Sequence, residues 1–260
     1  MAVPEWLDEL HLEPGPPWVA MGTRGLRDGL FVSDDDFDRD LAWKTNLLAT
    51  RHDDVFAALD TPAVLAASAE VLALAGGDDA SSLHPLDAAG RRVQEDLCVL
   101  VLRDGRPHLD AASLCFPSYW CLAEKIGRPL SEVHGPVPHY ADALAAKVDG
   151  FIARLRPGHM VWRRNWSIHD DPRYFLPHSD GPGGDELYLR SERQVLRRLH
   201  STDAVLFTIR TQQVPLHCVV ERPDIGARMA DAIDAWSTAL VAYKGGHGAV
   251  RARDWLRSQS

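Results

Sequence analysis

The sequence predicts an α+β fold, with one five-stranded antiparallel sheet, helices packed on it, an N-terminal helical extension and a C-terminal helix. Two observations predict this class. Five short apolar segments bounded by turn residues have the length and pattern of strands, and segments with helical spacing lie before, between and after them. The composition agrees, since 45% hydrophobic and 25% charged residues are ordinary for a globular chain of 260 residues.

The N-terminal part is expected to be helical after an irregular arm. Residues 1–35 are rich in Pro, Gly and Asp and form the arm, whereas Asp36–Leu59 has helical spacing with Lys44 on its polar side. Thr61-Pro62 has the residue types of an N-cap and first helical position, which predicts a second helix through Leu74. We expect residues 1–89 to pack on the core as one extension.

The middle of the chain changes to strands. They are expected at Leu97–Leu102, His108–Phe116, Met160–Ile168, Leu187–Val195 and Val205–Thr211. Helices are expected between the second and third strands, at Trp120–Ile126 and Pro138–Leu155. Two strands, a helical insert and three strands is the order of a PAS domain, so residues 90–215 are predicted to form a PAS-like core. Residues 216–260 would add a helix at Pro223–Leu240 and a frayed tail from 245.

Charge and targeting signals narrow the class of protein. The net charge of −9 argues against a nucleic-acid binder, which needs a basic face to displace counterions. The N-terminus lacks the features of a signal peptide, and no apolar run is long enough to cross a bilayer. The four cysteines form no metal-binding spacing. We therefore expect a cytoplasmic protein with reduced thiols and no membrane partner.

A set of short strings carries a more specific signal. In chain order they are Gln94-Glu95-Asp96-Leu97-Cys98, Cys115-Phe116-Pro117-Ser118, Glu124-Lys125-Ile126-Gly127-Arg128, Val133-His134-Gly135-Pro136-Val137-Pro138, Asn165-Trp166-Ser167-Ile168, Glu192-Arg193-Gln194 with Arg197-Arg198-Leu199, and Phe207-Thr208-Ile209-Arg210-Thr211. Together with Met21-Gly22 and Lys44, they resemble the haem-dependent oxidative N-demethylase family, in its haem subunit.

The resemblance implies haem b in a PAS-like fold, and an oxidoreductase of the monooxygenase type. Such an enzyme uses O2 and external electrons to convert a small methylamine to formaldehyde and the shorter amine. The sequence has no GxGxxG motif and no ferredoxin-type cysteine run. A separate flavin and iron–sulfur reductase is therefore the expected partner.

The preferred axial ligand of the haem iron is His134, which is flanked by glycine and prolines that let a macrocycle approach closely. The alternative is a loop histidine that caps the helix beginning near Pro138. Other candidate ligands are His139, His169, His178, Cys98 and Cys115. For the haem propionates we expect Arg193, Arg197, Arg198 and Arg210, the densest basic cluster of the chain, although each could instead pair within the sheet.

The expected catalytic residues are Asn165, Ser167 and Glu192. Asn165 and Ser167 share one face of a strand, and either could hydrogen-bond O2 or the amine or merely satisfy backbone groups. A carboxylate would receive a cationic amine, and Glu95 and Asp96 compete with Glu192 for that role.

Two other functions compete with this one. A PAS-like haem domain could act as a gas or redox sensor, which would bind O2 without turnover. A non-haem iron oxygenase could use His169, Asp171 and His217 as two histidines and a carboxylate, although that triad normally sits on a sheet of more strands.

Overall fold

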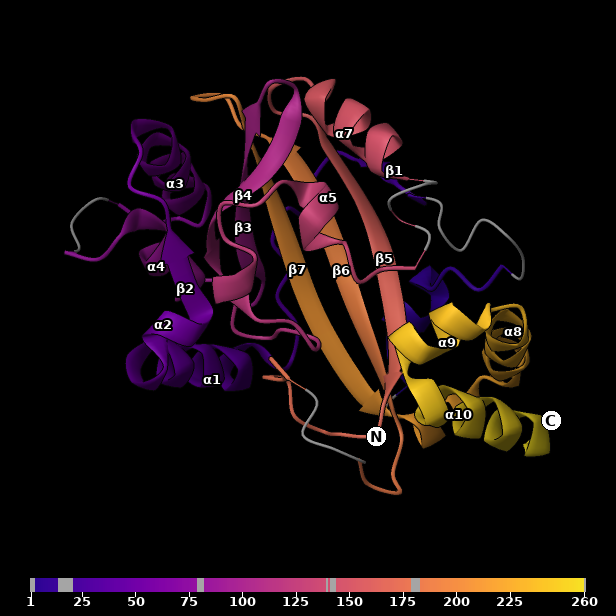
Figure 1. Ribbon diagram of the computed structural model, residues 1–260. Coiled ribbons are helices and arrows are strands. Elements are labelled where there is room, and N and C mark those ends of the chain that lie inside the picture. Colours follow the sequence, from indigo (N-terminus) through magenta and orange to yellow (C-terminus); the bar gives the residue numbers. More distant parts are fainter. Residues whose placement is uncertain are drawn as a thin grey trace.

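A seven-stranded antiparallel sheet organises the computed structural model of the chain, which describes residues 3–13, 21–78, 82–138, 140, 144–178 and 183–259 (Figure 1). The strand order is β1-β5-β6-β7-β3-β4-β2. The α+β class and the antiparallel sheet are thus confirmed. The predicted number of five strands is wrong, because the sheet has seven.

The five long strands lie where the sequence predicts them. They are β3 (Asp96–Arg103), β4 (Arg106–Ser113), β5 (Met160–His169), β6 (Tyr188–Arg198) and β7 (Ala204–Pro215).

The two additional strands are short and lie at the edges. β1 (Arg24–Leu26) pairs with the start of β5, and β2 (Phe56–Ala58) pairs with β4. Three residues are too few to show a strand period in the sequence. The first predicted helix, Asp36–Leu59, is therefore too long, because the helical part of this segment ends before β2. The N-terminal part therefore supplies strands to the sheet as well as helices.

The N-terminal helices are η1 (Glu5–Glu9), α1 (Phe37–Thr50), α2 (His52–Val55), α3 (Pro62–Leu74) and α4 (Pro85–Gly90). The predicted start of α3 is confirmed, because the Thr61 side chain accepts a hydrogen bond from the Val64 amide at 3.2 Å.

Lys44 corrects the expected polar face of α1. Its side chain is fully buried, and its ammonium donates to the carbonyls of Val93 and Glu95 and lies 3.9 Å from Asp96. A buried network, rather than water, therefore surrounds this cation.

The inserted helices are η3 (Leu122–Glu124), α5 (Leu130–Val133) and α7 (Ala145–Ala153). The longer helix expected here is described only in part, and His139 lies outside the described residues. Gly127 has a φ of +77°, as expected for the residue that ends a helical turn.

The C-terminal part is more ordered than the sequence predicts. It contains η4 (Leu216–Glu221), α8 (Pro223–Asp234), α9 (Thr238–Lys244) and α10 (Gly246–Ser258). α10 replaces the expected frayed tail because Ala249, Ala252 and Leu256 are buried in a core shared with α8. None of the described helices has the length and apolarity of a membrane span.

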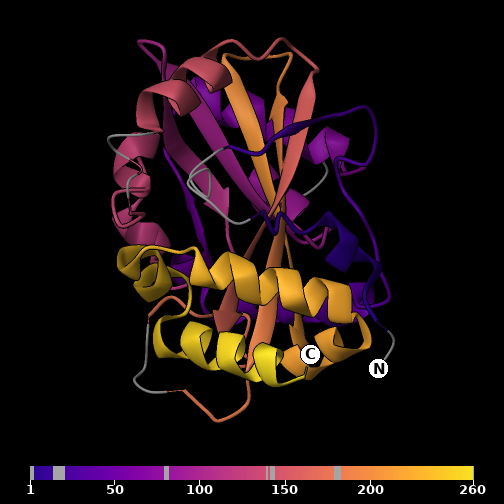
Figure 2. The same cartoon turned by 90° about the vertical axis from the view of Figure 1, so that its right-hand side faces the viewer.

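Helices cover both faces of the sheet. On one face, α5 and α7 pack over β3, β4 and β7 through Cys98, Leu100, Val205 and Ile209. On the other face, α3 and α4 cover one half of the sheet, and η1, α8 and α10 cover the half that holds Trp166. α1–α4 and α8–α10 consequently gather at opposite sides of the molecule (Figures 1 and 2).

Candidate functional site

A polar stripe crosses β5 and β6 on the sheet face that carries α5 and α7. Alternate residues of a strand share a face, and directly opposed residues of antiparallel strands share it too. The pairs Arg163 with Gln194, Asn165 with Glu192 and Ser167 with Arg190 are directly opposed. We call these six residues, with His169 at the end of β5, the polar stripe. The three expected catalytic residues, Asn165, Ser167 and Glu192, therefore lie side by side.

Hydrogen bonds connect one end of the stripe. The Arg163 Nε donates to Gln194 Oε1 at 2.8 Å, and Gln194 Nε2 donates to Glu192 Oε2 at 2.8 Å. Gln194 thus orients the guanidinium and the carboxylate without a direct ion pair between them. Burial lowers the pKa of Arg163, and the charge of Glu192 opposes that shift.

Lys244, the last residue of α9, reaches the stripe from the C-terminal helices. Its Nζ donates to Asn165 Oδ1 at 2.9 Å and to the Trp166 carbonyl at 2.8 Å. Burial, followed by the charge of Arg163, lowers its pKa to about 8. Gly245 follows with a φ of +149° and would place a Cβ 2.6 Å from the Ile168 carbonyl oxygen, so a residue without Cβ is required there.

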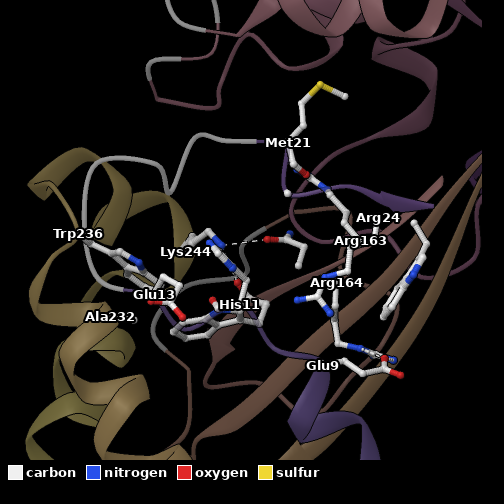
Figure 3. A pocket seen from close by; sticks show the side chains of 14 residues that line it. Glu9, His11, Glu13, Met21, Arg24, Arg163, Arg164, Ala232, Trp236 and Lys244 are labelled. Carbon is white, nitrogen blue, oxygen red and sulfur yellow. Dashed lines mark hydrogen bonds and ion pairs between the residues drawn. The ribbon is translucent and has the colours of Figure 1, made fainter. Parts of the chain in front are cut away.

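A cavity opens beside this end of β5, where β1 no longer covers the strand edge (Figure 3). It holds about 80 Å³ of free space, well below the ~300–1,000 Å³ of pockets for drug-sized ligands. Its walls include Arg163, Asn165, Trp162, Trp166, Trp236 and Lys244. Figure 3 shows Lys244 and Arg163 extending from α9 and β5 toward this space.

His134 directly follows α5, on the same side of the sheet as the stripe. Its Nδ1 lies 3.0 Å from the Leu130 carbonyl oxygen and must carry the proton to donate there. Nε2 then holds the free lone pair. The ring stacks on Tyr140 with centroids 4.6 Å apart. Burial lowers the pKa of His134 to about 4, so the imidazole is neutral at pH 7.

This arrangement matches what a haem ligand needs. Histidines that bind metals usually donate the second ring nitrogen to a carbonyl or carboxylate, which fixes tautomer and orientation. The donor chemistry of His134 therefore fits haem iron. The Nδ1 contact lies at the C-terminus of α5, whereas the capping alternative concerned the helix expected from Pro138.

The competing ligands are less available. Burial raises the pKa of Cys98, and burial raises that of Cys115 to about 12, with Asp96 adding to both shifts, so neither is a thiolate at neutral pH. His178 is exposed, on the loop after β5.

His169 is buried, and its Nε2 lies 3.0 Å from Ser167 Oγ and 3.3 Å from Ser118 Oγ. The non-haem triad is not assembled around it. Asp171 pairs with Arg173 at 2.6 Å, and His217 is exposed on η4. Across the described residues, no group of three or more His, Cys, Asp or Glu side chains is arranged to hold a metal ion.

The four arginines expected at the propionates do not form one site. Arg210 is buried in ion pairs with Asp34 at 2.7 Å and Asp40 at 2.9 Å. Arg193 donates to the Gly29 carbonyl at 2.8 Å. Arg197 contacts the Met160 sulfur at 3.4 Å, and Arg198 pairs with Asp203 at the turn after β6.

Arg193, Arg197 and Arg210 also lie on the sheet face opposite to the polar stripe, because they alternate with Glu192, Gln194 and Ile209. The geometry favours structural pairing for these arginines and leaves them out of the site.

The other two candidate carboxylates are structural as well. Asp96 accepts hydrogen bonds from the Cys115 and Phe116 amides, each at 2.8 Å. Glu95 accepts one from the Val32 amide at 2.8 Å. Glu192 is thus the one of the three that belongs to the stripe.

Arg163 and Lys244 belong to the site but are not among the residues predicted from the sequence. The strand alternation that placed Asn165 and Ser167 on one face also places Arg163 there, and that pattern could have singled it out. Nothing in the sequence links Lys244 to β5, since the two segments are far apart in the chain.

One family of known proteins matches most of the chain. Residues 41–252 match the family described as haem-dependent oxidative N-demethylase, alpha subunit-like, a range that contains every residue of the stripe, His134 and Lys244. The chain belongs to the haem-dependent oxidative N-demethylase alpha subunit-like family.

Proposed function

We propose that this chain is a haem-binding oxygenase that removes a methyl group from a small amine, using O2 and electrons from a separate flavin and iron–sulfur protein. The observation that carries the proposal is the neutral His134, whose Nδ1 is anchored to the Leu130 carbonyl and whose Nε2 is left for a metal. His134 would hold the iron of haem b. The five long strands, with α5 and α7 on one face, support a PAS-like core in this proposal.

The overall reaction balances as one methylamine, O2, two electrons and two protons giving the shorter amine, formaldehyde and water. Haem, when bound, supplies the oxidation of the N-methyl carbon. The carbon–nitrogen bond then breaks, and the amine nitrogen keeps its electron pair and takes a proton. The protein must hold the amine and manage that proton.

Glu192 is suited to both tasks. A carboxylate attracts a cationic ammonium group and can accept its proton, which frees the amine. Gln194 holds Oε2 of Glu192, and Asn165 lies directly opposite on β5. Asn165 offers an amide donor next to the carboxylate, because Lys244 binds its oxygen rather than its nitrogen. Ser167 extends the polar surface along β5.

The test is turnover by the haem-loaded chain. The protein is loaded with haem b, supplied with electrons by a flavin and iron–sulfur reductase, and given dimethylamine. Formaldehyde should appear in proportion to the O2 consumed. Glu192→Gln should lower kcat/KM by about 100-fold, within the range for a lost acid–base group, with an unchanged visible spectrum. The exposed Glu221→Gln on η4 should behave as wild type.

Two results would count against the proposal. A protein that binds haem and O2 but consumes no reductant with any amine would support the sensor function. Full activity in Glu192→Gln would remove the role of this carboxylate.

A further inference from the structure

We propose that Arg163 and Lys244 form a carboxylate-binding pair in the cavity beside β5. The chemistry recognised is that of a carboxylate on a small molecule. Two sources can supply it, a haem propionate or the carboxylate of an N-methylated amino acid, and both rest on the proposed function. The two side chains lie together whichever source supplies the carboxylate, and their binding role can be tested without measuring turnover.

The first observation is the lack of a counter-ion. Arg163 donates only to neutral oxygens, those of Gln194 at 2.8 Å and the Met21 backbone at 3.3 Å. Lys244 likewise donates to the Asn165 amide and the Trp166 carbonyl. Within the described part of the chain, neither side chain forms an ion pair.

The neighbouring residue shows the contrast. Arg164 lines the same cavity from the other face of β5 and pairs with Glu9 at 2.6 Å. The protein thus neutralises one arginine at this edge and leaves Arg163 without a carboxylate partner. Removing a cation from water is unfavourable unless an anion compensates it, so an anion from outside is the natural partner.

The charge balance favours a monoanion. Burial lowers the pKa of both Arg163 and Lys244, and the charge of Glu192 opposes each shift without reversing it, as expected for cations that form no direct ion pair. Four cations line the cavity, Arg24, Arg163, Arg164 and Lys244, together with two carboxylates, Glu9 and Glu13. Glu192 lies outside the lining but close enough for its charge to act on Arg163 and Lys244. Four cations and three carboxylates leave one excess positive charge, which a single carboxylate would neutralise and a phosphate dianion would exceed.

The shape of the cavity limits the ligand further. Its free space of about 80 Å³ takes a group of a few atoms, since a water needs about 10–15 Å³ by the same measure. Trp166 and Trp236 flank Lys244, with ring centroids 5.6 Å and 5.4 Å from Nζ, and they shield the ammonium from water. Arg163 supplies a planar fork and Lys244 a point charge, a combination that suits carboxylate oxygens.

Arg163→Gln and Lys244→Met test the pair in two binding experiments that do not depend on activity. The first compares haem b with its dimethyl ester, which lacks propionate charges, by absorbance titration. If a propionate is the ligand, each variant weakens haem b binding at least tenfold and leaves ester binding unchanged.

The second experiment titrates the protein with N-methylglycine or dimethylamine by calorimetry, with and without haem. If the substrate carries the carboxylate, wild type prefers N-methylglycine, and each variant loses at least tenfold in that preference. Arg156→Gln, an exposed cation after α7, is the matched control and should change neither titration.

The charge-conserving variants Lys244→Arg and Arg163→Lys are controls for a folding defect. They should keep most of the carboxylate binding. The proposal is overturned if both experiments give wild-type values for the charge-removing variants, or if Arg156→Gln weakens binding equally. A wild-type protein that binds no haem but prefers N-methylglycine would refute the proposed function and keep the carboxylate site.

Discussion

Replacing Arg210 by Met tests whether this arginine stabilises the fold or binds haem. Arg210 is 1% exposed, its Nη2 donates to both oxygens of Asp34 at 2.8 and 2.7 Å, and its Nη1 lies 2.9 Å from Asp40. Methionine fills the space of the stem but leaves two carboxylates without this cation. Asp40 is fully buried, so the loss of its arginine partner should account for most of the decrease in the free energy of unfolding.

Breaking a buried pair by removing one partner costs about 3–5 kcal/mol. Arg39 and Gln94 still bind Asp40, at 2.8 and 3.0 Å, so the lower end, about 3 kcal/mol, is expected here. For a chain of this length that corresponds to a fall in Tm of roughly 6–12 °C. The control is Arg197→Met, which loses only a contact with the Met160 sulfur and should change stability by less than about 1 kcal/mol.

The assay is urea unfolding followed by tryptophan fluorescence, combined with haem titration of the folded protein. The stability at acidic pH is a second measurement. Burial opposes ionisation of Asp34, but the hydrogen bond from Gln94 and the charge of Arg210 outweigh it and lower its pKa from 3.8. A lowered folded pKa gives stability that is present above 3.8 and lost as the pH falls through the folded value. On acidification below pH 3.8, the free energy of unfolding of Arg210→Met should therefore decrease less than that of wild type. A stability loss under about 1 kcal/mol together with a tenfold loss of haem affinity would refute the structural assignment.

Two further predictions concern the approach of α9 to β5. The pKa of Lys244 is lowered to about 8, mainly by burial, so at this group the unfolded chain binds more protons than the folded one between pH 8 and 10.5. Cys98 and Cys115, whose pKa values burial raises, act in the opposite direction in wild type and variant alike. Across that window the free energy of unfolding of wild type should therefore rise relative to that of Lys244→Met, and identical pH profiles would contradict the burial of this ammonium. Gly245→Ala should destabilise the protein by about 1–3 kcal/mol, because its Cβ would lie 2.6 Å from the Ile168 carbonyl oxygen. Gly248→Ala, inside α10 with only ordinary contacts, is the control and should be neutral or stabilising in thermal unfolding, so equal losses in both variants would exclude the proposed clash.

The long strands could be predicted because each carries its own apolar pattern over six or more residues. β1 and β2 could not, since each has three residues and gains its pairing only from the neighbouring strand. α10 was missed because glycines stand at its start, at Gly246 and Gly248. Burial against α8 stabilises it despite their low helix propensity.

The site was predictable to the extent that it follows from strand alternation. That rule placed Asn165 and Ser167 together, and the register then added Glu192. Charge partners from distant segments were not predictable. Asp34 meets Arg210 across 176 residues, and Lys244 meets Asn165 across 79. The density of arginines on β6 and β7 therefore pointed to a ligand site where the fold instead uses Arg198 and Arg210 in internal ion pairs and Arg193 in a hydrogen bond to a backbone carbonyl.

Haem titration of His134→Ala is the decisive test of whether His134 provides the axial ligand for haem. Wild-type protein should bind one haem b per chain with a sharp Soret band. His134→Ala should lose at least tenfold in affinity and show a shifted band that added imidazole restores, while the exposed His178→Ala matches wild type. An unchanged Soret position and affinity in His134→Ala would show that His134 does not bind the haem iron.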